Sequence, residues 1–270
     1  MRKYYKALTY IFLTIIGFIM VFPFLWMIST SLKTGVDIYS PSIIPETVTF
    51  NNYLRVIENS NFLVWFKNSL IIAAITTVSV LCFDTLVGYS FAKLPFKGKG
   101  PLFILILSTL MIPTEMLIIP WYMMSTSLGW LNSYWSLLFP GLTSAFGIFM
   151  MRQFFMGVPD DILEAGRIDG LSEFGIFLRT AVPMVKPAMA ALGIFTFLGN
   201  WNAFLWPVIA VDQPNIYTLP VGLALFSGES YNQWDLVMAA ASLATIPVLI
   251  VFFFFQKQII EGIHMTGLKA

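Results

Sequence analysis

The chain has 270 residues, of which 58% are hydrophobic and 11% are charged, whereas charged residues make up about 25% of an average soluble domain. A soluble core of this size cannot bury so much apolar surface, so the composition predicts a membrane protein. The net charge of +1 offers no basic field for nucleic acid. One cysteine, Cys82, excludes an intrachain disulfide, and one histidine, His264, cannot build a metal site alone.

Six apolar stretches are long enough to be transmembrane helices, because crossing roughly 30 Å of hydrocarbon takes about 20 residues. We predict spans at 8–28, 68–92, 102–119, 134–151, 188–211 and 236–255. The second span carries Asp84, the third carries Glu115, and Pro113 and Pro120 interrupt the third. The predicted fold class is an all-α polytopic membrane protein, with residues 1–270 forming one transmembrane domain. The first stretch ends in FPFLW rather than in the small residues of a cleavage site, so we expect it to be retained.

The distribution of lysine and arginine predicts the orientation. Twelve of these residues fall on the side that holds both termini, and only Lys33, Arg55 and Lys67 fall on the other. Positive charge is concentrated in cytoplasmic loops, so both termini are expected in the cytoplasm of a cell whose cytoplasmic membrane the chain crosses. The eight tryptophans all lie at or near the outer ends of the predicted spans, where indoles anchor at the headgroup level.

Polar residues inside the spans are candidates for a solute path. In the fifth span, Asn200 and Asn202 flank Trp201, so that amides could bind hydroxyl groups and the indole could stack on a sugar ring. The alternative is hydrogen bonding between helices, which we favour for Asn202. An ionised Asp84 facing lipid at mid-membrane would cost about 2.5–3.5 kcal/mol. We therefore expect Asp84 to face the helix bundle, to be protonated or to pair with Lys93, in a structural role.

The long inner loop, 152–187, has the pattern of two short helices. Asp160 and Asp161 follow Pro159, where a helix N-terminus favours negative charge. Gly170 is a natural helix end, Ser172 is a candidate N-cap for a second helix, and we expect Pro183 to close that helix. Physical chemistry alone leaves two interpretations open, an amphipathic pair lying on the membrane and a knob that docks a protein.

The segment EAGRIDG, with Pro183 thirteen residues after Gly170, resembles the signature cytoplasmic loop of binding-protein-dependent ABC importer permeases. Glu164, Ala165, Gly170 and Pro183 match that signature in register. Gly166 stands where a second alanine is usual. The segments MIPTE, PMVKPA, GNWNAFLWP and FQKQIIEGI look like those of carbohydrate-uptake permeases, above all the smaller membrane subunit of maltose-type importers. The resemblance covers essentially the whole chain.

The resemblance implies a type I ABC importer permease fold, with a coupling helix in the loop 157–183 seated on a cytoplasmic ATPase. The coupling residues that it implies are Glu164, Ala165, Gly166, Asp169, Gly170 and Pro183. Because the chain has no G-x-x-x-x-G-K-[ST] phosphate loop, ATP and Mg²⁺ are expected on that partner, and no catalytic residue or cofactor is expected on this chain. The other implied partners are a second homologous permease, a second copy of the ATPase, an extracytoplasmic solute-binding protein meeting an outer loop such as 212–235, and a sugar.

Three alternatives to a sugar importer follow from the sequence. An importer permease for a non-sugar solute would have a similar inner loop. A transporter or channel that works without ATP predicts inverted repeats and a charged relay at the midplane, and one buried aspartate gives little of either. A membrane enzyme needs a catalytic constellation, which one histidine and one cysteine do not supply.

Overall fold

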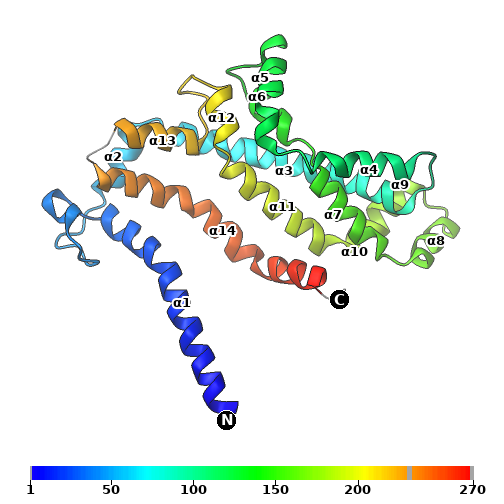
Figure 1. The fold of residues 1–270 in the computed structure, drawn as a ribbon, viewed down its shortest axis with the longest axis horizontal. Coiled ribbons are helices and arrows are strands. Elements are labelled where there is room, and N and C mark those ends of the chain that lie inside the picture. Colours follow the sequence, from blue (N-terminus) through cyan, green and yellow to red (C-terminus); the bar gives the residue numbers. More distant parts are fainter. Residues whose placement is uncertain (1, 230–232, 268–270) are drawn as a thin grey trace. The chain divides into compact units, whose positions relative to one another are not determined.

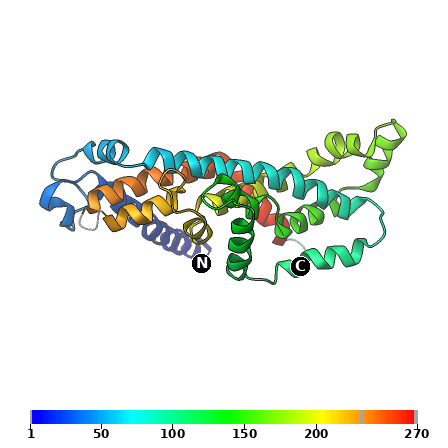
Figure 2. The same cartoon turned by 90° about the horizontal axis from the view of Figure 1, so that it is seen from above.

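The computed structural model describes residues 2–229 and 233–267, with side chains described for 5–6, 8–228 and 233–256, and every regular element in these residues is a helix (Figures 1 and 2). Four helices are long and apolar enough to cross a membrane, and two bent helix pairs bring the candidate spans to as many as six in the described part. The predicted all-α polytopic class is confirmed.

The chain forms two compact units, residues 1–64 with 221–247 and residues 65–220 with 248–270. The first unit contains α1 (Arg2–Ser31), η1 (Gly35–Tyr39), α2 (Asn51–Asn59), most of α13 (Leu219–Glu229) and the start of α14 (Trp234–Gly267). The second contains most of α3 (Phe62–Lys93), α4 (Lys99–Thr109), η2 (Thr114–Leu117), α5 (Ile118–Ser127), α6 (Tyr134–Leu138), η3 (Phe139–Gly141), α7 (Ala145–Met156), α8 (Asp160–Ile168), α9 (Glu173–Ile176), η4 (Phe177–Ala181), α10 (Val182–Met184), α11 (Lys186–Trp201), α12 (Leu205–Ala210) and the end of α14.

Three predicted spans are interrupted, and in the fourth the break lies at residues 142–144, between η3 and α7. The third bends by 92° between α4 and the helical segment that begins at Thr114, and Pro113 immediately precedes that segment. The fifth, predicted as one helix over 188–211, ends as α11 at Trp201 and restarts as α12 at Leu205. Pro207 has no N–H to continue a helix from Ala203, and it is tolerated in the first turn of a new one. The prediction of a continuous fifth helix is therefore wrong.

The outer loop predicted at 212–235 contains a helix that the sequence analysis did not predict, α13. This apolar helix has 11 residues, about half the number that a membrane span needs.

The second unit has a core at each end of α3. The inner core joins the spans to the loop after α7, and its buried residues are Val80, Tyr89, Met151, Phe155, Val158, Leu163, Ile176, Phe177, Ala181, Val185, Ala188 and Leu192. The outer core includes Trp206, whose ring centroid lies 5.6 Å from that of Trp121 and 6.1 Å from that of Phe139. The indole N–H of Trp206 donates to the carbonyl of Ser136 at 2.7 Å. These two tryptophans therefore pack within the protein rather than serving only as interfacial anchors.

In the first unit, a fully buried lysine organises the loop after α1. Lys33 Nζ donates to the carbonyls of Ser40 and Ser42 at 3.0 and 2.6 Å, and it lies 5.2 Å from the ring centroid of Trp26. The Asn52 amide donates to the Lys33 carbonyl at 2.9 Å. A buried ammonium group needs such acceptors because it has left water.

Replacing this lysine by methionine, Lys33→Met, should loosen the loop at 34–50. A hydrogen bond to a charged donor contributes about 1.5–3 kcal/mol, so we expect amide hydrogen exchange at Ser40 and Glu46 to accelerate by about tenfold or more. The exposed Lys67 gives the matched control, Lys67→Met. Equal exchange in both variants would contradict the role assigned to Lys33.

Candidate coupling site

The inner loop after α7 folds as predicted, as two short helices joined at a glycine. α8 carries Asp160 and Asp161 in its first turn. It ends at Ile168, with Asp169 as the C-cap, and is followed by Gly170, whose φ is +80°. The Gly170 N–H donates to the Arg167 carbonyl, and the Leu171 N–H donates to the Gly166 carbonyl. This pair of bonds is the Schellman arrangement, which requires a left-handed residue at the glycine position.

The second helix begins at the predicted cap. Ser172 Oγ accepts from the Gly175 N–H at 3.2 Å, so the N-cap prediction is confirmed. The prediction that Pro183 closes this helix is wrong, because the chain continues through η4 into α10, which contains Pro183. A proline near the start of a short helix loses no helical hydrogen bond. The break comes at Val185, before α11.

The two helices pack against the C-terminal ends of α3 and α7 through their apolar sides. The ring of Phe177 lies 5.2 Å from that of Tyr89 and 6.3 Å from that of Phe155. Leu163 and Ile176 are also fully buried in this core. We call residues 157–183 the coupling knob; Figure 1 shows it beyond the ends of α3 and α7. Its buried apolar side chains favour a knob fixed to the protein over a helix pair lying on lipid.

The implied coupling residues divide into exposed and buried positions. The exposed ones are Glu164, Ala165, Asp169, Gly170 and Pro183. Gly166 is buried, and a Cβ added there would lie 3.2 Å from Ile176 Cγ1. Gly166 therefore permits close packing of α9 within the knob. The sequence analysis missed Ile168, an apolar side chain at the end of α8 that is 87% exposed.

A lysine holds the start of α8, a role that the sequence did not indicate. Lys93, the last residue of α3, donates from Nζ to the Val158 carbonyl and to Asp160 Oδ1, both at 2.6 Å. Pairing of Lys93 with Asp84 is therefore wrong. A polar cavity of about 360 Å³ lies beside this contact, lined by Ala92, Lys93, Met156, Asp160, Leu163, Glu164 and Arg167.

Removing the Lys93 ammonium group should free the start of α8. Its hydrogen bond and charge lower the pKa of Asp160 from the ordinary 3.8. The contact is therefore fully present above that value and is lost only as the pH falls through the lowered pKa. We expect Lys93→Met to accelerate amide exchange across 160–164 from pH 5 to pH 8. The exposed Lys97 supplies the control, Lys97→Met, and an effect of Lys93→Met no larger than that of the control would refute the contact.

The three candidate residues of the translocation path do not form one open surface. Trp201 is 3% exposed; its ring stacks on that of Phe197 with centroids 5.9 Å apart and meets the edge of Phe66 at 5.3 Å. Asn200 and Asn202 each donate to a carbonyl one turn back in α11, at 2.9 Å. Asn202 is the C-cap of α11, at the break before α12, and its side chain bonds within this turn; a bond from Asn202 to another helix stays a prediction.

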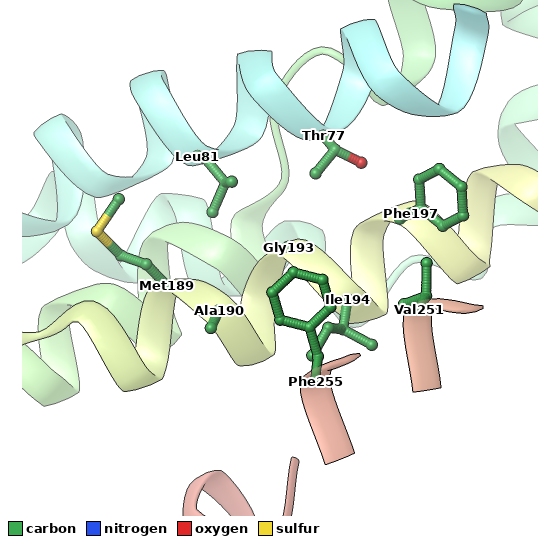
Figure 3. A pocket seen from close by; sticks show the side chains of 9 residues that line it. All are labelled: Thr77, Leu81, Met189, Ala190, Gly193, Ile194, Phe197, Val251 and Phe255. Carbon is green, nitrogen blue, oxygen red and sulfur yellow. The ribbon is translucent and has the colours of Figure 1, made fainter. Parts of the chain in front are cut away.

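An apolar cavity of about 290 Å³ lies between α3, α11 and the end of α14 (Figure 3). The residues around it are Thr77, Leu81, Met189, Ala190, Gly193, Ile194, Phe197, Val251 and Phe255. The hydroxyl of Thr77 already donates to the Ala73 carbonyl at 2.6 Å. A sugar requires polar partners for its hydroxyl groups, so this cavity does not fit one.

Residues 84–264 match the model of one protein family, described as binding-protein-dependent transport system inner membrane component. The chain belongs to this family. As an inner membrane component it is a multi-pass membrane protein of a transport system. The match contains the whole coupling knob and α11.

Individual relatives of this inner membrane component match over almost their full length. The arabinooligosaccharides transport system permease protein of Bacillus subtilis is 33% identical, with 98% of this chain and 96% of the relative covered. The lactose transport system permease protein of Rhizobium radiobacter is 31% identical, with 97% and 96% covered. The trehalose/maltose transport system permease protein of Thermococcus litoralis is 30% identical, with 95% and 94% covered.

A solved structure gives the fold. A chain of a bacterial ABC transporter involved in the import of the acidic polysaccharide alginate matches with a TM-score of 0.85 and 24% identity, covering 94% of this chain and 96% of that chain. The expected ABC importer permease fold is thereby confirmed.

Proposed function

We propose that this chain is the permease subunit of an ATP-driven sugar importer, in which it forms half of the translocation pathway. The observation that carries the proposal is the full-length similarity to permease proteins for arabinooligosaccharides, lactose and trehalose/maltose. Each of these names refers to a sugar, so the substrate class proposed for this chain is a carbohydrate, and the individual sugar is left to experiment.

The coupling knob is the proposed contact with a cytoplasmic ATPase. Its helix α8 exposes acidic side chains, among them Asp161 and Glu164, together with the apolar Ile168. The knob is packed onto the inner ends of two spans, so a partner that moves it would move those spans as well. ATP and Mg²⁺ would then bind to the partner, and this chain would carry no catalytic residue.

The proposed assembly has three kinds of protein partner. A second, homologous permease would supply the other half of the pathway, and two copies of the ATPase would bind on the cytoplasmic side. An extracytoplasmic solute-binding protein would deliver the sugar, in line with the family description. This arrangement places both termini in the cytoplasm, the side to which twelve of the fifteen lysine and arginine residues are assigned.

Deleting the gene in its native host tests the substrate class. We expect loss of uptake of at least one labelled sugar in a panel of arabino-, malto- and galacto-oligosaccharides, with uptake of histidine and phosphate unchanged. The tagged chain, returned on a plasmid, should restore uptake and purify from membranes with an ATPase. Loss of histidine or phosphate uptake instead would support a non-sugar solute, and uptake that persists without ATP would refute the importer.

A further inference from the structure

The carboxylate of Asp84 is fully buried within the membrane-spanning α3. Its Oδ1 accepts from Thr143 Oγ1 at 2.7 Å. Its Oδ2 accepts from both the backbone N–H and the hydroxyl of Ser144, each at 3.0 Å. All three bonds run to the break in the fourth span, just before α7. The expectation that this side chain faces the bundle is confirmed.

These bonds attach the carboxylate to the start of a helix. Ser144 is the N-cap of α7, and its Oγ accepts from the Gly147 N–H at 2.8 Å while donating to Asp84. A carboxylate is favourable at a helix N-terminus, where N–H groups are unsatisfied. A Cβ on Gly147 would lie only 2.2 Å from Asp84 Oδ2. Glycine is therefore required there for the carboxylate to approach.

The contact between α3 and α7 continues toward the cytoplasm. A Cβ on Gly88 would lie 2.7 Å from Met151 Cβ and 2.9 Å from the Arg152 backbone nitrogen, so the two helices approach closely there. Arg152 Nε donates to the Phe91 carbonyl at 3.2 Å. The next contact along α3 is that of Lys93 with the start of α8. Polar anchors thus hold α7 to α3 at the start of α7 and just beyond its end, where α8 begins.

We propose that Asp84 is a positioning residue that fixes α7, and through it α8, to α3, so that the three helices move as one body. The inference rests on the proposed function, since it assigns α8 to an ATPase. Without the carboxylate, the Ser144 N–H loses its partner inside the membrane, and the bond from Ser79 Oγ to the Leu142 carbonyl, at 2.6 Å, is left between α3 and this break. Displacement of α8 would then still reach the end of α3 through Lys93, but the break before α7 would absorb part of it before it reaches the middle of α3.

The direct test is Asp84→Asn in the complete transporter, reconstituted in liposomes with its partners. An amide has one acceptor oxygen where the carboxylate has two, so one set of bonds is lost. We expect sugar uptake to fall by about fivefold or more while basal ATP hydrolysis continues, so that more ATP is consumed per sugar. Glu115, an exposed carboxylate in the bend of the third span, gives the matched control Glu115→Gln, which should transport normally.

A second variant reaches the same contact without changing the aspartate. Gly147→Ala should displace the carboxylate and reproduce the uncoupling, and the double variant should be no worse than the more affected single one, because both remove one interaction. Additive losses would overturn the proposal. So would normal uptake by Asp84→Asn, or a fall in uptake matched by an equal fall in ATP hydrolysis, which a merely structural role would give.

A distance measurement separates this inference from the proposed function. Spin labels at Val78→Cys and Asp161→Cys, both exposed positions, would be compared in a Cys82→Ser background with and without ATP. We expect one narrow distance in both states, and a broader distribution with Asp84→Asn. If the distance between the two labels changes with ATP while Asp84 is present, the proposal that α3, α7 and α8 move as one body is wrong. The importer assignment would be unaffected. A narrow distance distribution in a transporter that takes up no sugar would support movement of the three helices as one body. It would count against the proposed substrate.

Discussion

Substituting valine for the glycine at the corner of the coupling knob, Gly170→Val, is expected to reduce sugar uptake to about a tenth or less. The φ of Gly170 is +80°, and a left-handed conformation costs an ordinary residue roughly 1–2 kcal/mol, with β-branched side chains affected most. No atom lies within 4 Å of an added Cβ. The effect therefore comes from the backbone, which would have to abandon the two hydrogen bonds that close α8.

Two controls show whether the conformation is what matters. Gly170→Asn should keep most of the uptake, because asparagine tolerates left-handed geometry. Gly157→Ala lies at the other end of the loop, where an added Cβ meets only one ordinary contact, 3.4 Å from the Phe154 carbonyl oxygen, and it should transport normally. Uptake would be measured in liposomes, together with the amount of chain in the membrane and of co-purified ATPase. Normal uptake by Gly170→Val would remove the corner from the coupling mechanism.

Reversing the charge at Glu164 is expected to have an effect of similar size. Glu164 is exposed on α8, and its charge, after the stronger contribution of Glu173, helps to raise the pKa of Arg167. Surface charges of this kind contribute little to folding, so Glu164→Lys should leave the knob intact. A lysine facing a partner that expects a carboxylate brings like charges together. We therefore expect loss of ATPase co-purification and of uptake, with normal membrane insertion.

The matched variant for this prediction is Asp161→Lys, the same reversal of charge at another exposed position of α8. If Glu164 contacts the partner specifically, Asp161→Lys should retain clearly more uptake, and Glu164→Gln should lie between Glu164→Lys and the natural protein. Equal losses for the two lysine variants would indicate a general requirement for negative charge on the knob.

Local signals in the sequence were sufficient for most of the helices. Span lengths follow from apolar run lengths, and the turn at Gly170 and the cap at Ser172 depend on residues no more than a few positions apart. The short apolar helix α13 was missed because its length falls below that of a span, and a short apolar run has no distinctive period. The restart at α12 was missed because residues 188–211 form one uncharged, mostly apolar run, which predicts a single helix.

The polar contacts that fix the knob could not be predicted because their partners are distant in the chain. Asp84 bonds to a residue 59 positions away, and Lys93 bonds to one 67 positions away. The cost of Asp84 in lipid was recognised from the sequence, which is a local argument. The hydrogen-bond partner that offsets this cost is set by the packing of α3 against α7. No periodicity in the sequence of either helix specifies that packing.

The cavity beside α11 gives α3 two unlike sides. Toward α7 the helix is held by directional bonds, whereas toward α11 it meets Gly193, the empty volume and side chains whose contacts are almost wholly apolar. Helices joined by apolar contacts can slide past one another at a small cost in free energy. Breaking a hydrogen bond inside a membrane costs more, because no water replaces the lost partner. Within this unit, we therefore expect sliding between helices to occur between α3 and α11 rather than between α3 and α7. Filling this cavity with a larger side chain, for example by Ala190→Leu, should slow sugar uptake. It should leave binding of the coupling knob to the ATPase unchanged.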